Sequence, residues 1–174
     1  MSKAFTRESD DAPERPTVSA PRSALPPGTK NYLTPDGAER LRKELESLVQ
    51  VERSRIAALP DAEEARRLLH SLDQRVIQIK QTLASAVVVP APSTPEDRVR
   101  FGATITVREL DGISRYRIVG VDETDPERGW ISWLSPIAKA VMNARVGERV
   151  RLKLPTGEQE LEILSITYRL EKRG

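Results

Sequence analysis

The sequence predicts an α+β protein in which a pair of long helices precedes a small domain built from a sheet and one short helix. Three observations lead to this fold class. Apolar residues recur every three or four positions between residues 38 and 86, which is the period of a helix that packs along one face. From Val99 onward apolar and polar residues alternate, as in strands. Proline-rich stretches separate these regions.

The chain divides into four segments. Residues 1–30 are rich in Pro, Ser, Asp and Arg and lack apolar periodicity, which predicts a disordered tail. Residues 31–89 are expected to form an antiparallel coiled-coil hairpin. Residues 90–98 contain three prolines and little to bury, so they are expected to be a linker. Residues 99–170 then form the domain with the sheet.

The first helix of the hairpin has a clear start and a weak end. Thr34 followed by Pro35 is typical of a helix start, because the hydroxyl caps free amides and proline fits the first helical position. The seam weakens at Glu52, and Pro60 ends the helix near Leu59. Its apolar seam consists of Ala38, Leu41, Leu45 and Leu48.

The second helix has a more regular seam. Its predicted positions are Leu69, Leu72, Val76, Ile79, Leu83 and Ala86, which alternate steps of three and four as in a coiled-coil strand. Two helices of about 25 residues each would make a rod about 37 Å long.

Three carboxylates lie at the turn between the helices, in Asp61, Glu63 and Glu64. Asp61 with Glu64 three residues later forms a capping-box pattern, and acids in a first helical turn interact favourably with the helix dipole. A structural role therefore explains them. A second reading stays open, in which carboxylates at the end of a rod are presented to a metal that another protein holds.

The C-terminal domain is predicted to contain strands around an Asp111-Gly112 turn, which is a strong hairpin signal. Ser135-Pro136 starts a short helix. The predicted strands are residues 99–110, 113–120, 130–135, 148–154 and 159–168. Five aromatic residues are expected to contribute to the core, namely Phe101, Tyr116, Trp130, Trp133 and Tyr168.

Composition excludes several kinds of site. The 174 residues include no cysteine and one histidine, His70, so disulfides and thiolate metal sites are absent and a protein zinc site or a Ser-His-Asp triad lacks material. The net charge of +2 does not indicate a surface that binds nucleic acid by charge. Scattered arginines such as Arg66, Arg67 and Arg75 nevertheless leave DNA or RNA binding independent of a partner protein open. No long apolar run is present, and we expect a cytoplasmic protein.

Several motifs together resemble the bacterial Gre transcript-cleavage factors, with the stronger likeness to GreB. The resemblance covers about residues 31–168, and the opening MSKAFTRESD also looks like the start of GreB-type chains. The motifs are Asn31-Tyr32-Leu33-Thr34, Phe101-Gly102-Ala103, Tyr116-Arg117-Ile118-Val119-Gly120, Asp122-Glu123, Gly129-Trp130-Ile131-Ser132, Ser135-Pro136-Ile137-Ala138 and Arg145-Val146-Gly147-Glu148.

The resemblance implies a C-terminal domain of the FK506-binding-protein type that docks at the rim of the RNA polymerase secondary channel. The coiled coil then enters the channel, and its tip acids help to hold a Mg²⁺ ion of the polymerase, so that water attacks backtracked RNA. Such a factor has no cofactor of its own and at most indirect contact with nascent RNA. By position in the motifs, the candidate polymerase-contacting residues are Asp122, Glu123, Ser135 and Pro136, with Asp125 as an addition.

The sequence departs from the family at the tip. No loop resembling G-D-x-S-E-N-x-x-Y lies between Ile56 and Leu72, and the hairpin is about a dozen residues short. Six fewer residues per helix shorten a rod by about 9 Å. A carboxylate must come within about 2.0 to 2.6 Å of a metal to ligate it, so catalytic roles are not assigned to the three tip acids.

The resulting expectation is a non-enzymatic, monomeric regulator that binds RNA polymerase without efficiently stimulating cleavage, and that has neither a metal site nor a membrane partner. One alternative is an active cleavage factor in which Asp61, Glu63 and Glu64 reach the polymerase site in a different docked position. Another is a peptidyl-prolyl isomerase, which would need an apolar pocket lined by aromatic residues, and the sequence contains few of these. Pairing of two hairpins from different copies also stays open.

Overall fold

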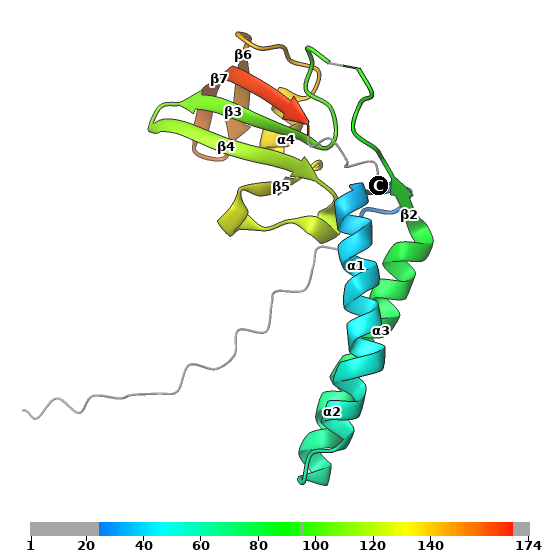
Figure 1. Ribbon diagram of the computed structural model, residues 1–174. Coiled ribbons are helices and arrows are strands. Elements are labelled where there is room, and N and C mark those ends of the chain that lie inside the picture. The colour runs from blue at the N-terminus through cyan, green and yellow to red at the C-terminus, as the bar shows by residue number, and fades with distance from the viewer. Residues whose placement is uncertain (1–24, 95, 169–174) are drawn as a thin grey trace, which may run out of the picture.

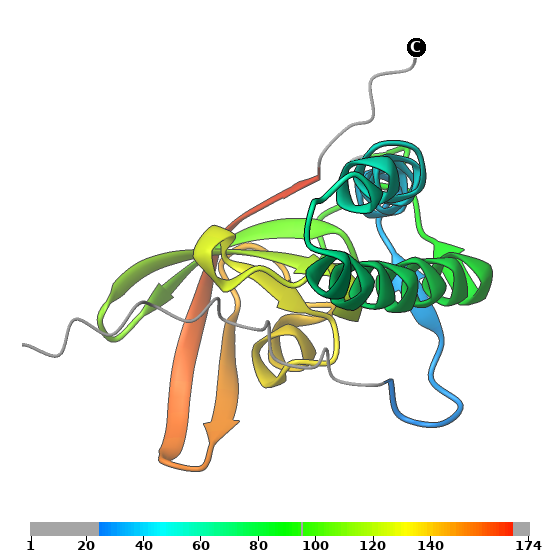
Figure 2. The ribbon, with the colours of Figure 1, turned by 90° about the horizontal axis from the view of Figure 1, so that it is seen from below.

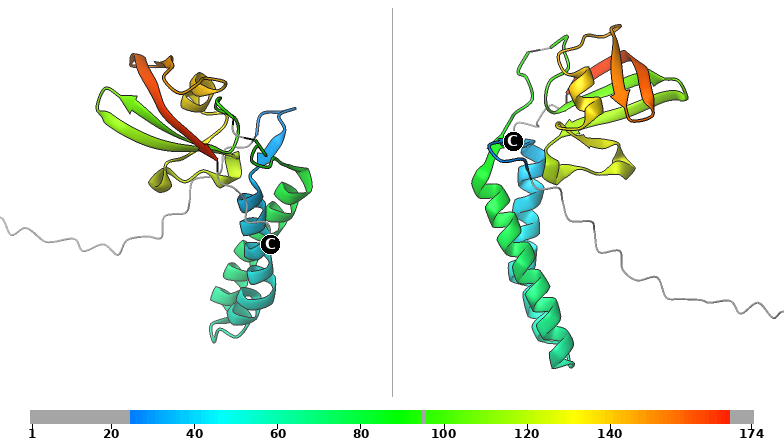
Figure 3. Two further views of the ribbon diagram at one scale, coloured as in Figure 1. Left: turned by 45° about the horizontal axis from the view of Figure 1, so that its top comes forward. Right: turned by 180° about the vertical axis from the view of Figure 1, so that it is seen from behind.

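The computed structural model describes residues 25–94 and 96–168; residues 1–24 of the predicted tail, residue 95 and residues 169–174 lie outside the described part. The described chain is a mixed α+β protein (Figure 1). Two long helical stretches form a narrow arm (residues 35–85), and a curled sheet with one short helix forms the body (residues 99–168). Two further views show that the arm projects from one end of the body (Figure 3).

The first helical stretch of the arm begins where the sequence predicts. α1 (Pro35–Ser47) has Thr34 as its N-cap, and the Thr34 hydroxyl accepts a hydrogen bond from the amide of Gly37 at 3.1 Å. The stretch continues through a π-helical turn, η1 (Leu48–Glu52), and then α2 (Arg53–Ala57). The sequence pattern does not indicate the π-helical turn, which ends at the residue where the apolar seam is interrupted.

The second stretch, α3 (Ala62–Ser85), runs back beside α1 and α2 (Figures 1 and 2). Its 24 residues give a length of about 36 Å. The predicted seam residues Leu72, Val76 and Ile79 are buried, and Leu69 and Leu83 are half-buried. The prediction for Ala86 is wrong in one respect, because the helix ends at Ser85 and Ala86 begins a strand.

The base of the arm is closed by a pair of short strands that the sequence does not predict. β1 (Asn31–Leu33) pairs in parallel with β2 (Ala86–Val88). The side-chain amide of the buried Asn31 donates to the carbonyl of Thr82 at 3.3 Å, which gives one of the last carbonyls of α3 a partner. A small core of Leu33, Ala38, Leu41 and Ile79 fills the space between the strands and the helices.

The body is a five-stranded sheet in the order β5-β4-β3-β7-β6. The pairs β3–β4, β3–β7 and β6–β7 are antiparallel, and β4–β5 is parallel. The elements are β3 (Ala103–Glu109), β4 (Gly112–Val119), β5 (Trp130–Ser132), α4 (Pro136–Val141), β6 (Arg149–Leu154) and β7 (Gly157–Tyr168). The predicted elements are therefore all present, although β3 and β5 are shorter than predicted.

The β3–β4 turn lies one residue earlier than its sequence signal suggests. Glu109 pairs with Gly112, so the two turn residues are Leu110 and Asp111 rather than Asp111 and Gly112. Gly112 has a φ of 138°, a backbone conformation that residues other than glycine rarely adopt. This conformation explains why the first residue of β4 is a glycine.

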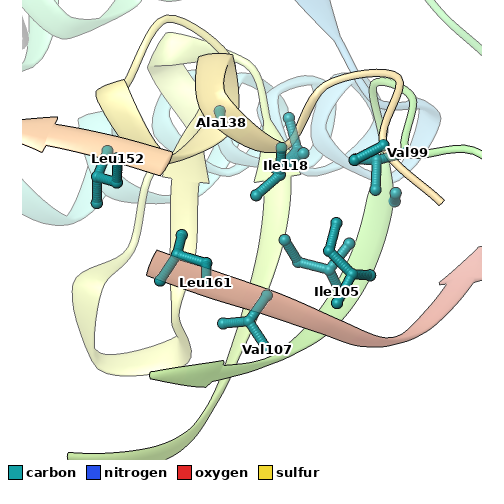
Figure 4. Close-up of a cluster of buried hydrophobic side chains, with 11 residues drawn as sticks. Val99, Ile105, Val107, Ile118, Ala138, Leu152 and Leu161 are labelled. Carbon is teal, nitrogen blue, oxygen red and sulfur yellow. The ribbon is translucent and has the colours of Figure 1, made fainter. Parts of the chain in front are cut away.

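A bulge in β7 decides which side chains face the core. The β3–β7 register shifts between Thr106 and Val107, so that Thr106 pairs with Ser165 while Val107 pairs with Ile163. The extra residue, Leu164, reverses the alternation of β7. Side chains on one face pack in the core against Ala138 of α4, among them Ile105, Val107, Ile118, Leu152 and Leu161 (Figure 4). The opposite face of the sheet carries Thr104, Thr106, Arg115, Arg117, Ser165 and Thr167.

Candidate functional site

The loop between β4 and β5 carries three of the five predicted contact residues. Two 3₁₀ turns, Val121–Glu123 and Pro126–Arg128, shape this loop. Asp122, Glu123 and Asp125 line one cavity of about 200 Å³ against α1, together with Gly37, Arg40, Leu41, Glu44 and Thr124. The structure thus brings the three acids together at the base of the arm.

Glu123 is the interior member of this group, with a side chain that is only 1% exposed. Its carboxylate accepts hydrogen bonds from the amide of Thr34 at 2.8 Å, from the hydroxyl of Thr34, and from the amide of Gly120 at 3.1 Å. Arg40 adds an ion pair at 3.5 Å. A buried carboxylate is stable only with such partners, so Glu123 joins the start of α1 to the loop of the body.

Two glycines leave room for this carboxylate. A Cβ on Gly37 would overlap the carboxylate of Glu123, and a Cβ on Gly120 would overlap the carbonyl oxygen of Tyr32. Neither glycine has a positive φ, so the close approach of neighbouring atoms, rather than backbone conformation, accounts for glycine at both positions.

Asp122 and Asp125 are partly exposed, and each accepts hydrogen bonds. The carboxylate of Asp122 accepts a hydrogen bond from the hydroxyl of Thr82 in α3 at 3.3 Å. The carboxylate of Asp125 accepts from the amides of Glu127 at 3.1 Å and Arg128 at 3.3 Å, and pairs with the guanidinium of Arg128 at 3.2 Å. Both residues therefore hold the loop in place while part of each side chain faces solvent.

Ser135 and Pro136 do not line this cavity. The Ser135 hydroxyl accepts a hydrogen bond from the amide of Ala138 at 3.2 Å, so Ser135 is the N-cap of α4. Pro136 occupies the first helical position and is exposed. The predicted helix start is confirmed, and this pair forms a second feature of the body surface.

Trp130 differs from the sequence prediction that it belongs to the core. Phe101, Tyr116, Trp133 and Tyr168 do pack against the core of the body. Trp130 instead lies on the other face of the sheet. The guanidinium carbons of Arg40, Arg117 and Arg128 are 4.6, 5.2 and 5.2 Å from its ring centroid.

The turn between α2 and α3, which leads into the three tip acids, lies at the far end of the arm (Figure 1). Asp61 is the N-cap of α3, and its carboxylate accepts from the amides of Glu63 at 2.9 Å and Glu64 at 3.0 Å. All three acids are exposed. Within residues 25–94 and 96–168, His, Cys, Asp and Glu side chains form no group of three or more that could hold a metal ion.

Comparisons with known proteins bear on the body first. Residues 94–168 match the family described as transcription elongation factor, GreA/GreB, C-terminal part. Over 155 aligned positions, the chain is 38% identical to transcription elongation factor GreB of Neisseria meningitidis serogroup A, covering 80% of this chain and 95% of that protein. The chain belongs to the GreA/GreB family. The resemblance found in the sequence motifs is therefore confirmed.

Other GreA/GreB proteins show a similar relationship. The chain is 35% identical to GreB of Pseudomonas aeruginosa, covering 85% of this chain and 94% of that one. It is 35% identical to GreA of Helicobacter hepaticus, covering 79% and 93%. Among solved structures, GreA factor homolog 1 of Thermus thermophilus matches with 24% identity and a TM-score of 0.35, covering 80% of this chain and 99% of that one.

Sequence reasoning missed the contacts that join the arm of this Gre-family protein to its body. Arg117 in β4 pairs with Asp36 in α1 at 3.1 Å, and both Arg40 and Arg117 approach Trp130. The sequence predicts Thr34 only as a helix cap, whereas its amide and its hydroxyl also donate to Glu123. These partners are far apart in the chain, and no local motif signals such pairings.

Proposed function

We propose that this Gre-family protein binds RNA polymerase at the rim of its secondary channel and regulates elongation without efficiently stimulating transcript cleavage. The observation that carries the second part is the tip. The turn between α2 and α3 spans residues 58–61, and the carboxylate of Asp61 already caps two amides of α3. Both bonds are accepted by Oδ1, so the cap fixes this carboxylate against the end of α3 and only Oδ2 lies outside the cap.

The length of the arm supports the same conclusion. The alignment with the Neisseria relative has 155 positions. Only 80% of the 174 residues of this chain take part in it, which is fewer residues than positions. Some positions of the alignment are therefore gaps in this chain. We infer that the missing residues belong to the arm, which would then be about 9 Å shorter than in a competent cleavage factor. Metal ligation requires about 2.0 to 2.6 Å, so such a deficit prevents it unless docking is deeper.

The docking surface is proposed to lie on the body, which would be a domain of the FK506-binding-protein type. Asp122, Asp125, Ser135 and Pro136 have at least part of each side chain exposed and would contact the polymerase. Glu123 cannot contribute a direct contact in this structure because its side chain is buried. We therefore assign Glu123 the role of positioning the loop that carries Asp122 and Asp125.

This function requires no catalytic group in the chain itself. The protein would act as a monomer in the cytoplasm, without a cofactor of its own, and at most would influence the RNA-cleaving activity of the polymerase. In the described part of the chain, no helix is long and apolar enough to cross a membrane. Any Mg²⁺ ion involved in cleavage would be held by the polymerase.

The test uses purified backtracked elongation complexes. The full chain is added alone, and then together with a competent Gre factor, while the length of the RNA is followed. We expect no cleavage from the chain alone and reduced cleavage when the competent factor is also present. Rapid cleavage by the chain alone would overturn the proposal, and an undiminished effect of the competent factor would argue against binding at the shared site.

Two variants separate docking from other effects. Asp122→Ala combined with Ser135→Gly should weaken the competition, because both changes lie on the proposed docking surface. Glu158→Ala, which changes an exposed acid in β7, serves as the control and should compete like the unmodified chain. Equal competition by both variants would remove the assigned contacts while leaving the channel assignment to be judged by the first experiment.

One observation favours a second candidate function, a cleavage-stimulating factor. Glu63 and Glu64 are exposed in the first turn of α3 at the end of the arm, so their carboxylates face solvent. If docking is deeper than in longer relatives, these acids could meet the polymerase-bound Mg²⁺. In that case Glu63→Ala with Glu64→Ala abolishes cleavage and leaves polymerase binding intact, whereas persistent cleavage in this variant rules the tip out.

A further inference from the structure

The face of the sheet that points away from α4 contains a cavity of about 460 Å³. Its lining comes from β3, β4, β5, β7 and the loop before β5. The register explains this composition, because Thr104 lies directly opposite Arg117 on one side and Thr167 on the other. Trp130 extends the same row, since it pairs with Arg117.

The charged residues of the lining are all cationic. Arg115, Arg117 and Arg128 line the cavity, and no carboxylate does. Two acids hold the guanidiniums from outside the lining, Asp36 on Arg117 at 3.1 Å and Asp125 on Arg128 at 3.2 Å. Arg115 has no ion pair within residues 25–94 and 96–168. The acids therefore fix the direction of two guanidiniums while the cavity itself stays positive.

One polar atom in this lining is buried and unused. Arg117 is 8% exposed, and its Nε has no hydrogen-bond partner in the described chain. Buried polar atoms without a partner are uncommon in folded proteins and call for an explanation. The fork of an arginine matches the oxygens of phosphate, and threonine hydroxyls such as that of Thr104 can add further donors.

The dimensions and the aromatic residues narrow the class of ligand. A volume of about 460 Å³ falls within the range of small-molecule sites, roughly 300 to 1,000 Å³, and exceeds what a lone phosphate needs. Trp130 supplies aromatic surface beside the guanidiniums, whereas the rings of Tyr116 and Tyr168, two further lining residues, pack against the core. Beyond the cavity the same face is neutralised, because Arg108 pairs with Glu162 at 3.0 Å, so no long basic track is available for a nucleic-acid backbone.

We propose that this cavity, the arginine cavity, binds a small phosphate-bearing molecule of nucleotide size. Arg115 and Arg117 would contact the phosphate oxygens, and the ring of Trp130 would contact the organic part. This site lies on the face of the sheet that points away from α4, and none of its lining residues lines the cavity that contains Asp122, Glu123 and Asp125. It also differs from the apolar, aromatic-lined pocket that a prolyl isomerase would need.

The test is isothermal titration calorimetry on the full chain, without polymerase and at low ionic strength, where charge interactions are least screened. The probes are inorganic pyrophosphate, ADP and a short RNA oligonucleotide. We expect saturable binding of at least one of the two free compounds. Tighter binding of ADP would identify a nucleotide as the source of the phosphate, and equal binding would identify the phosphate groups alone.

Two arginine variants complete the experiment. Arg115→Gln should weaken binding by about tenfold or more, as expected for a lost hydrogen bond to a charged group. Arg115 is exposed and unpaired in the described chain, so this variant should fold normally, which thermal unfolding can verify. Arg151→Gln removes another exposed arginine, from β6 and outside the arginine cavity, and should bind like the unmodified protein.

Three results would overturn the proposal. The first is the absence of saturable binding by any of the three probes. The second is an equal loss in Arg115→Gln and Arg151→Gln, which would mean that only overall charge attracts the probes. The third is saturable binding of the oligonucleotide with none of ADP or pyrophosphate, which would assign the face to nucleic acid instead.

Discussion

Glu123 accepts hydrogen bonds from both the backbone amide and the side-chain hydroxyl of Thr34, a residue 89 positions earlier in the chain. This pairing connects the first residue before α1 to the loop after β4. Both residues are buried, so loss of these hydrogen bonds should lower the free energy of unfolding of the whole protein rather than only loosen the loop.

The first prediction concerns this carboxylate. Glu123→Ala leaves the buried amides of Thr34 and Gly120 without their acceptor, and we expect the free energy of unfolding to fall by about 2 to 4 kcal/mol. Chemical denaturation measures the change. Glu127→Ala, an exposed acid in the same loop, is the control and should have little effect. Equal stability of both variants would show that the Glu123 contacts contribute nothing net.

The second prediction uses the close approach of Gly37 to Glu123. Gly37→Ala should destabilise the protein although alanine favours helices, because the new methyl group overlaps the carboxylate. In the double variant with Glu123→Ala that overlap is gone. The double variant should therefore be less destabilised than the two single changes added together, by more than about 0.5 kcal/mol. Simple additivity would contradict the overlap.

The third prediction separates structural and functional roles at the tip. Asp61→Ala removes the cap of α3 and should lower the free energy of unfolding by about 1 kcal/mol. Glu63→Ala leaves the cap in place and should change stability little. Thermal and urea unfolding of both variants distinguish these outcomes, and a neutral Asp61→Ala would mean that the cap seen at residues 61–64 adds no stability.

The fourth prediction concerns the pairing of the helices. Arg75 donates to both carboxylate oxygens of Glu44, at 2.6 and 2.8 Å, and the Arg75 side chain is 22% exposed. A double-mutant cycle with Arg75→Ala and Glu44→Ala should give a coupling energy of up to about 1 kcal/mol. The exposed pair Glu39–Lys43 on the same helix is the comparison and should show weaker coupling.

The fifth prediction is a dependence on high pH. Burial, and a hydrogen bond to Glu109 at 2.8 Å, raise the pKa of Tyr116 above 10.0. The unfolded chain then loses this proton more readily than the folded one. The contribution of Tyr116 to the free energy of unfolding is therefore fully present below about pH 10, and it is lost as the pH rises through the pKa of the folded state.

Urea unfolding at a series of alkaline pH values tests this behaviour. Tyr116→Phe lacks the titrating group, so its stability should fall less steeply above about pH 10 than that of the unmodified protein. Tyr168, whose pKa is also raised by burial, remains in both proteins and contributes equally to both curves. Parallel curves would show that Tyr116 titrates alike in the folded and unfolded chain.

Helix starts were predictable because their signals are local. Thr34-Pro35, Asp61 and Ser135-Pro136 all cap helices as predicted, since a capping side chain bonds to amides two or three residues away. The alternation in β3 and β4 also identified the hairpin correctly, with the turn displaced by one residue.

Features that depend on distant partners were not predictable. The pairing of Asn31 with Ala86 and the bonds from Thr34 to Glu123 join residues with no common motif. Trp130 illustrates the same difficulty, because a tryptophan in a strand suggests the core, and only the positions of the three surrounding arginines explain its place on the opposite face. Nor does any local pattern mark Leu164 as the residue that reverses the faces of β7.

The attachment of the arm has a mechanical consequence. α3 has 24 residues, so the arm is a lever of about 36 Å, and a tilt of about 10° at its base would sweep the tip sideways by about 6 Å. The pivot is held by the Thr34–Glu123 bonds and by the Asp36–Arg117 ion pair at 3.1 Å, on two different segments of the body. A small change in either contact would therefore displace Asp61 by several times as much. The position of the tip depends on side chains that lie at the other end of the arm.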